Sequence, residues 1–254
     1  ALVGVDVGPL EALGPLARVV QRLDLHHGGT DARVEAAIDR VITIVRPALI
    51  VNALGVVKSI ASDPEATIRL NALFPHQLAA GADRVGARLV HISTDCVFSG
   101  HRGDYREEDV PDPEDLYGRT KLLGEILREP HLTARTSFIG REIDTSNGLL
   151  EWFLCQRGTV QGFVNAIWSG FVAPELAHVL LELAVRTNAT GLVHVAGERI
   201  DKYSLLLLMR DIFKRADQNI SSPAECTLLI KDCRPLNPDL AIFRIKLTGL
   251  LICC

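Results

Sequence analysis

The sequence lacks the features of several broad classes of protein. Its longest apolar stretches, such as 48–57 and 205–209, are shorter than the roughly 20 residues that a transmembrane helix needs. Its 27 basic and 31 acidic side chains give a net charge of −4, and the Lys and Arg residues form no cluster. We therefore expect no membrane span and no nucleic-acid partner, because phosphate binding requires a concentrated basic surface.

The sequence also lacks the patterns of metal sites and secreted proteins. The six cysteines have no CxxC spacing and lie among apolar residues, which favours reduced, buried thiols over a metal site or a disulfide framework. The start of the chain has no charged segment followed by a small-residue cleavage site, which indicates no signal peptide. With 48% hydrophobic residues, we expect a globular protein of the cytoplasm without a bound metal.

What the sequence does contain is an alternation of short apolar runs with segments of helical period. We expect strands at 48–53, 88–93, 133–139 and 191–195, and helices at 31–45, 64–85, 117–128, 149–155, 174–185 and 203–213. This order predicts an α/β fold with a doubly wound, mostly parallel sheet. The first three strands do not alternate, which predicts burial on both faces.

A break near 145–148 predicts two parts of the chain. We expect a dinucleotide-binding domain at 1–145. The remainder, 146–254, is expected to be mainly a substrate-binding lobe, with strands that return to the main sheet. Composition barely changes across the break, so the two parts are expected to pack as one body.

Tyr117 and Lys121 give the clearest chemical signal. They lie four residues apart at the start of a predicted helix, so their side chains share one face. An ammonium beside a phenol favours the phenolate and lowers the phenol pKa toward the range of an acid/base catalyst. The pair alone is a short motif, and coincidence on a helix surface is the alternative.

Two strand ends add to this pair. Strand 88–93 runs into Thr94, which places a hydroxyl at the carboxyl end of a parallel strand, where open α/β sheets bind ligands. The stretch 51–55 ends another strand with small residues, which let a flat cofactor approach the backbone. Asn71 follows in the next helix, where an ordinary helix polar residue is the alternative reading.

Three segments together resemble the extended short-chain dehydrogenase/reductase family, and within it the dTDP-4-dehydrorhamnose reductase branch. They are HISTDCVFSG at 91–100, YREEDVPDPEDLYGRTKLLGE at 105–125 and ARTSFIG at 134–140, and their order is far more specific than a YxxxK pair. The resemblance covers roughly 21–203. It implies a Rossmann-like fold with a small C-terminal substrate lobe, NADP or NAD as cofactor, and often a homodimer. The implied activity is reduction of a keto group on a nucleotide-activated deoxysugar, as in dTDP-rhamnose biosynthesis.

The resemblance also implies roles for individual residues. It makes Tyr117 the catalytic acid, Lys121 its pKa-lowering partner and a ligand of the nicotinamide ribose, and Thr94 the third member of the triad. Besides Tyr117 and Lys121, the residues implied to line the cofactor are Asp24, Asn52, Ala53, Leu54, Asn71 and Ser93, with Asp6 as the alternative to Asp24. Those implied to face the sugar are Thr94, Asp95, Cys96 and Phe138. Cys96 and Phe138 stand where the branch usually has tyrosine and tryptophan, which leaves the sugar open.

One feature of the family is missing from its expected place. A glycine-rich GxxGxxG turn between the first strand and helix should hold the cofactor pyrophosphate, but the glycines of residues 1–30 do not have this spacing. We therefore expect the sheet to lack its first, glycine-rich βαβ unit. Three explanations stay open: a fragment of an active reductase, which the intact triad favours; a replacement of the turn by the irregular first thirty residues; or a non-catalytic relative.

Two other functions are alternatives to the reductase. A sugar-nucleotide epimerase or dehydratase has the same fold, and a dehydratase would want an acidic residue beside Thr94, which Asp95 supplies. A regulatory or binding subunit of this fold is favoured by the missing glycine turn and disfavoured by the intact triad.

Overall fold

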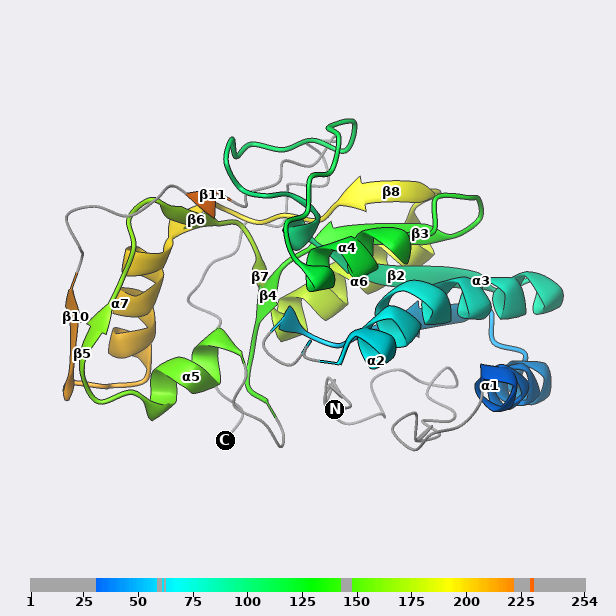
Figure 1. The fold of residues 1–254 in the computed structure, drawn as a ribbon, viewed down its shortest axis with the longest axis horizontal. Coiled ribbons are helices and arrows are strands. Elements are labelled where there is room, and N and C mark those ends of the chain that lie inside the picture. Colours follow the sequence, from blue (N-terminus) through cyan, green and yellow to red (C-terminus); the bar gives the residue numbers. More distant parts are fainter. Residues whose placement is uncertain (1–30, 59–60, 62, 143–147, 222–228, 231–254) are drawn as a thin grey trace.

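A four-stranded parallel sheet forms the centre of the molecule (Figure 1). The structure, a computed structural model, describes residues 31–58, 61, 63–142, 148–221 and 229–230. The strands lie in the order β1 (Leu49–Asn52), β2 (Arg88–Thr94), β3 (Leu132–Thr136) and β8 (Gly191–His194), and each neighbouring pair is parallel. The predicted α/β class with a parallel sheet is therefore confirmed.

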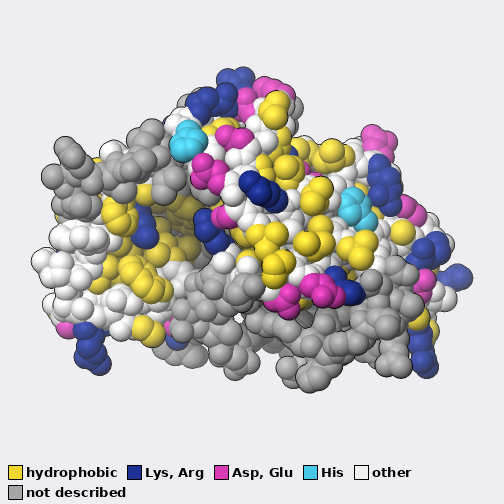
Figure 2. All heavy atoms as spheres, in the orientation of Figure 1, with side chains coloured by type: hydrophobic (Ala, Val, Ile, Leu, Met, Phe, Trp, Pro, Cys, Tyr) yellow, Lys and Arg dark blue, Asp and Glu magenta, His cyan; other side chains and the backbone are white. Residues whose placement is uncertain are grey.

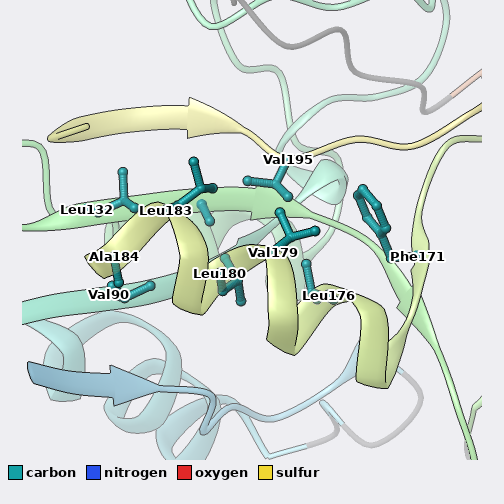
Figure 3. Close-up of a cluster of buried hydrophobic side chains, with 10 residues drawn as sticks. Val90, Leu132, Phe171, Leu176, Val179, Leu180, Leu183, Ala184 and Val195 are labelled. Carbon is teal, nitrogen blue, oxygen red and sulfur yellow. The ribbon is translucent and has the colours of Figure 1, made fainter. Parts of the chain in front are cut away.

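Helices cover both faces of this sheet (Figure 1). One face carries α3 (Phe74–Val85) and α4 (Leu116–Leu123), with α1 (Asp31–Val45) packed against α3, and the other carries α6 (Ala173–Arg186). The apolar side of α6 lies on Val90 and Leu132 through Val179, Leu180 and Leu183 (Figure 3). Their burial removes apolar surface from water and holds the helix on the sheet.

A second group of elements lies beyond the carboxyl ends of the sheet strands (Figure 1). It consists of α5 (Leu149–Cys155), β5 (Gly158–Gln161), β6 (Ala166–Trp168), β9 (Ile200–Asp201), α7 (Lys202–Ile212), β10 (Gln218–Ser221) and β11 (Leu229–Ile230). Strand β5 pairs with β10, and β6 pairs with both β9 and β11. This group has its own core, in which Phe153, Leu205, Leu206 and Met209 are buried. The parallel pair of β4 (Phe138–Ile139) and β7 (Phe171–Val172) lies between it and the main sheet.

The structure corrects three predicted boundaries. The helix expected at 64–85 is divided into α2 (Pro64–Ile68), a π-helical turn η3 (Arg69–Leu73) and α3. The helix expected to reach 128 ends at Leu123, because the backbone N–H and C=O of Ile126 both hydrogen-bond the Thr133 hydroxyl at 2.9 Å. The strand expected at 133–139 breaks at Ser137, whose carbonyl accepts a hydrogen bond from the Phe171 N–H, so that β4 leaves the main sheet and pairs with β7.

Two predictions of burial are also wrong. Val51 on β1 is 46% exposed, because β1 is the edge of the four-stranded sheet and only Leu49 reaches the core under α6. The Cys155 thiol, expected to be buried, is exposed at the end of α5, and Cys96 is half-buried. Among the described residues, no helix is long and apolar enough to cross a membrane.

Two buried histidines tie the strands together by accepting hydrogen bonds. His131 Nδ1 accepts the Leu89 N–H at 3.2 Å, and its Nε2 lies 3.0 Å from Asp83 Oδ1. His91 Nδ1 accepts a hydrogen bond from the Asn52 amide nitrogen at 3.0 Å. The orientation of the Asn52 amide is fixed because its oxygen accepts the Leu54 N–H. Burial lowers the pKa of His131 and lowers the pKa of His91 far more strongly. Both rings are therefore neutral in the folded protein near pH 7.

These histidines predict that the protein loses stability below neutral pH. Each folded-state pKa lies below the unfolded value of about 6.5, so the stabilisation is complete above that value and is lost as the pH falls, because the unfolded chain binds the extra protons. The unfolding free energy, measured by urea denaturation, should fall between pH 7 and pH 5.5 with a slope of up to about 1.4 kcal/mol per pH unit for each histidine. His131→Gln should reduce this slope, and a slope that is flat or reversed in the natural chain would contradict the account.

Candidate functional site

The end of β2 and the start of α4 bring the predicted triad together. Thr94 is the last residue of β2, and its hydroxyl hydrogen-bonds the Tyr117 phenol. Lys121 lies one helical turn after Tyr117 and donates from Nζ to the Ile92 carbonyl oxygen at 2.6 Å. Thr94 and Lys121 are buried, while Tyr117 is half-buried. The three side chains meet at the edge of the sheet where ligands of open α/β folds bind.

Burial decides the protonation of this group. Burial raises the pKa of the Tyr117 phenol well above its usual value, and Cys96 and Asp95 add to the rise, whereas the hydrogen bond with Thr94 opposes it. Burial also lowers the pKa of Lys121 to about 8, against the opposing charge of Glu125. The expected lowering of the phenol pKa is therefore reversed, because desolvation outweighs the favourable contacts and the ammonium is bound to a carbonyl. Tyr117 thus holds its proton near neutral pH.

The start of α4 is fixed by residues that the sequence reasoning did not single out. Asp115 Oδ1 caps the helix by accepting the Gly118 N–H at 2.7 Å, and its Oδ2 lies 2.7 Å from Lys58 Nζ. Gly118 packs against the 94–96 turn so closely that a Cβ there would overlap the Cys96 carbonyl oxygen. An Asp two residues before a helical tyrosine is an N-cap signal that could have been recognised.

The loop after β1 is held over the same site by buried asparagines. Asn52 Oδ1 accepts the Leu54 N–H at 3.1 Å. Asn71, on the π-helical turn, accepts the Val56 N–H at 2.8 Å and donates to the Val56 carbonyl at 2.9 Å. Asn71 also donates to the Thr120 hydroxyl of α4 at 3.3 Å. These bonds attach the loop to the helix that carries Tyr117 and Lys121.

The other predicted site residues fall into three groups. Asn52, Asn71 and Ser93 are buried and bonded within the protein, whereas Ala53 is exposed and Leu54 half-buried on the loop after β1. On the expected sugar side, Asp95 is buried, Cys96 is half-buried and Phe138 is 41% exposed on β4. Asp6 and Asp24 lie outside the described residues. Direct contact of any of these residues with cofactor or sugar stays a prediction.

The described residues fit the nicotinamide-ribose end of a dinucleotide. The Lys121 ammonium has three hydrogens to donate, and among the described residues the Ile92 carbonyl accepts one of them. Gly55 faces the ammonium, since a Cβ there would lie 3.9 Å from Lys121 Nζ and 3.1 Å from Asn71 Oδ1. No glycine-rich turn leads from a strand into a helix among the described residues, so the fit does not extend to the pyrophosphate.

The surface is hollowed beside this site. Figure 2 shows a depression between the second group of elements and the start of α4, with hydrophobic side chains on its floor and basic side chains at its rim. A depression with an apolar floor and few charges suits an organic ligand. Among the described residues, no group of His, Cys, Asp and Glu is arranged to hold a metal ion.

Comparison with known proteins agrees with this geometry. The model of the RmlD substrate binding domain family matches residues 16–251. The chain belongs to this family. The RmlD family is part of the extended short-chain dehydrogenases/reductases, so the resemblance carried by residues 91–140 is confirmed.

Relatives of two kinds are similar to this RmlD-family chain. A dTDP-4-dehydrorhamnose reductase from Shigella flexneri is 32% identical over 229 residues, which cover 83% of this chain and 75% of that protein. The methionine adenosyltransferase 2 subunit beta from Xenopus laevis is 27% identical over 242 residues, covering 85% and 69%. A crystal structure described as a hypothetical dTDP-4-dehydrorhamnose reductase from Sulfolobus tokodaii has a TM-score of 0.70 and 28% identity, covering 85% and 81%. The Rossmann-like fold is shared with these proteins.

The close contact at Gly118 predicts a sensitive position. Gly118→Ala should force α4 away from the 94–96 turn and reduce the free energy of unfolding by about 1–3 kcal/mol, because the added methyl has no space. Arg119→Ala, on the exposed side of the same helix, should change it by less than about 0.5 kcal/mol. Denaturant unfolding of the two variants measures the difference, and equal stabilities would contradict the packing described here.

Proposed function

We propose that this chain is an NAD(P)-dependent reductase of a keto group on a nucleotide-activated deoxysugar. The observation that carries the proposal is the meeting of Thr94, Tyr117 and Lys121 at the carboxyl end of β2, beside a depression between two groups of elements. The reductase relatives support the class of substrate. The proposed division assigns 1–145 to cofactor binding and 146–254 mainly to the sugar nucleotide.

Each residue of the triad has a distinct task in this proposal. When bound, the cofactor supplies the hydride for the keto carbon. Tyr117 donates its phenolic proton to the keto oxygen. The raised pKa keeps the phenol protonated near neutral pH but makes it a weaker acid, so the donation depends on stabilisation of the phenolate. Thr94 orients the phenol through its hydroxyl, and Lys121 places a positive charge one turn away, where it stabilises the phenolate left after proton transfer.

The substrate-side residues differ from those expected in the reductase branch. Cys96 and Phe138 take the places of a tyrosine and a tryptophan, and Phe138 is exposed on β4. We propose that they contact the sugar together with Asp95. Smaller side chains at both places would enlarge the sugar site, so the proposal covers dTDP-4-keto sugars related to 4-dehydrorhamnose as well as 4-dehydrorhamnose itself.

A regulatory subunit is the second candidate function. It is favoured by the relatives named methionine adenosyltransferase 2 subunit beta and by the lack of a glycine-rich turn among the described residues. Such a subunit would keep the fold and the buried side chains of α4 without turnover. Cofactor binding and turnover separate the two candidates.

The reductase proposal predicts a specific loss in Tyr117→Phe. The natural chain should bind NADPH or NADH in a nicotinamide fluorescence titration and should oxidise it when dTDP-4-dehydrorhamnose or a related dTDP-4-keto sugar is added. Tyr117→Phe should keep cofactor binding and lose turnover by about 10²-fold or more, because the proton donor is absent.

Tyr105→Phe is the matched control. The Tyr105 hydroxyl is buried and accepts the Gly100 and Arg102 N–H groups at 3.2 Å, away from the triad, so its removal should leave turnover within a few-fold of the natural chain. Retained turnover in Tyr117→Phe would overturn the proposal. Absence of turnover and of cofactor binding in the natural chain would favour the regulatory subunit.

A further inference from the structure

A buried ion pair lies just beyond the end of α4, where Glu125 follows Lys121 by four residues. Glu125 accepts two hydrogen bonds from the Arg135 guanidinium, both at 2.8 Å, one on each carboxylate oxygen. The two side chains are only 4% and 3% exposed. A buried ion pair is costly to desolvate, and removal of one partner leaves the other charge buried without compensation.

The same carboxylate holds the strand that ends at the triad. The Ser93 hydroxyl donates to Glu125 Oε1 at 2.7 Å, while Lys121 donates to the neighbouring Ile92 carbonyl at 2.6 Å. Two successive residues of β2 are therefore bound by Lys121 on α4 and by Glu125 just after the end of this helix. This double attachment sets the register between Thr94 and Tyr117, since both lie next to these contacts.

Among the described residues, two groups interact electrostatically with Lys121. Glu125 raises its pKa, and His91 on β2, which is neutral, lies near it. Tyr117 lies one turn before Lys121 on α4, and Arg135 on β3 is paired with Glu125. Asp95 and Cys96 act on the phenol of Tyr117. Glu125 is thus the carboxylate that opposes the desolvation of the ammonium.

We propose that Glu125, held by Arg135 and Ser93, is a positioning residue that keeps Lys121 charged and α4 in register with β2. The inference rests on the proposed function, because it concerns the same triad. A cation that lost this carboxylate would be buried beside a carbonyl alone and would give up its proton at lower pH. The stabilisation of the phenolate after proton transfer would then be lost.

The test is a direct titration of Lys121 in the full chain. Lysine labelled with ¹³C at the ε carbon reports each ammonium by NMR, and Lys121→Arg assigns the signal. We expect a pKa of about 8 in the natural chain and a value lower by about one unit or more in Glu125→Gln. The alkaline limit of kcat/KM with NADPH and the keto sugar should move by the same amount.

Glu107→Gln is the matched control within the same buried region. Glu107 Oε1 accepts the His194 N–H at 2.8 Å on β8, and His194 Nε2 lies 3.4 Å from an Arg135 nitrogen, so the variant alters a carboxylate near the pair without touching Lys121. It should leave the Lys121 titration unchanged. A shift of equal size in Glu107→Gln would overturn the proposal, as would an unshifted Lys121 in folded Glu125→Gln.

Glu125→Gln leaves Arg135 buried without its partner, which can prevent folding. A second variant keeps the test valid in that case. Glu125→Gln with Arg135→Met removes both charges, which buried pairs often tolerate. It should show a Lys121 pKa that is lowered, but by less than in Glu125→Gln, because a neighbouring cation is removed together with the carboxylate. The NMR titration needs no turnover. If the natural chain has no turnover but Glu125→Gln still lowers the Lys121 pKa, only the proposed reductase activity is contradicted. If the natural chain has turnover but Glu125→Gln leaves the Lys121 pKa unchanged, only the role of Glu125 is contradicted.

Discussion

The site depends on the burial of the Lys121 ammonium against the Ile92 carbonyl. This single bond of 2.6 Å joins the helix with the proton donor to the strand that ends in Thr94. The cation is enclosed by α4, β2 and the loop after β1, whose approach is possible because Gly55 has no side chain. The asparagine contacts, the helix cap at Asp115 and the ion pair at Glu125 all hold the elements that enclose this charge.

Enclosure of that charge explains why the electrostatics differ from the simple view of a tyrosine beside a lysine. In water the ammonium would lower the phenol pKa by its charge. Here both groups lose solvent, so each is pushed toward its neutral form, and the phenol becomes a better holder of its proton. The phenol is thus protonated at neutral pH, and the Lys121 charge favours release of that proton to a keto oxygen by stabilising the phenolate.

The sequence was sufficient for those parts of the fold that depend on local pattern. Apolar runs located β1, β2 and β8, helical spacing located α1 and α5 with their observed ends, and the four-residue spacing placed Tyr117 and Lys121 on one helix face. The Glu125–Arg135 pair joins the segment after α4 to β3, and no local sequence pattern predicts a contact between separate elements. The π-helical turn at Asn71 and the break at Ser137 likewise follow from tertiary hydrogen bonds. The direction of the Tyr117 pKa required knowledge of burial.

The central claim is that Tyr117 protonates a keto oxygen while the carbon is reduced. Single turnover with NADPH deuterated at nicotinamide C4 and dTDP-4-dehydrorhamnose, followed by mass spectrometry of the sugar nucleotide, tests it most directly. The account predicts a product with deuterium on the reduced carbon, formed by the natural chain and lost in Tyr117→Phe. A chain that binds the cofactor yet forms no labelled product from this or any related dTDP-4-keto sugar would contradict it.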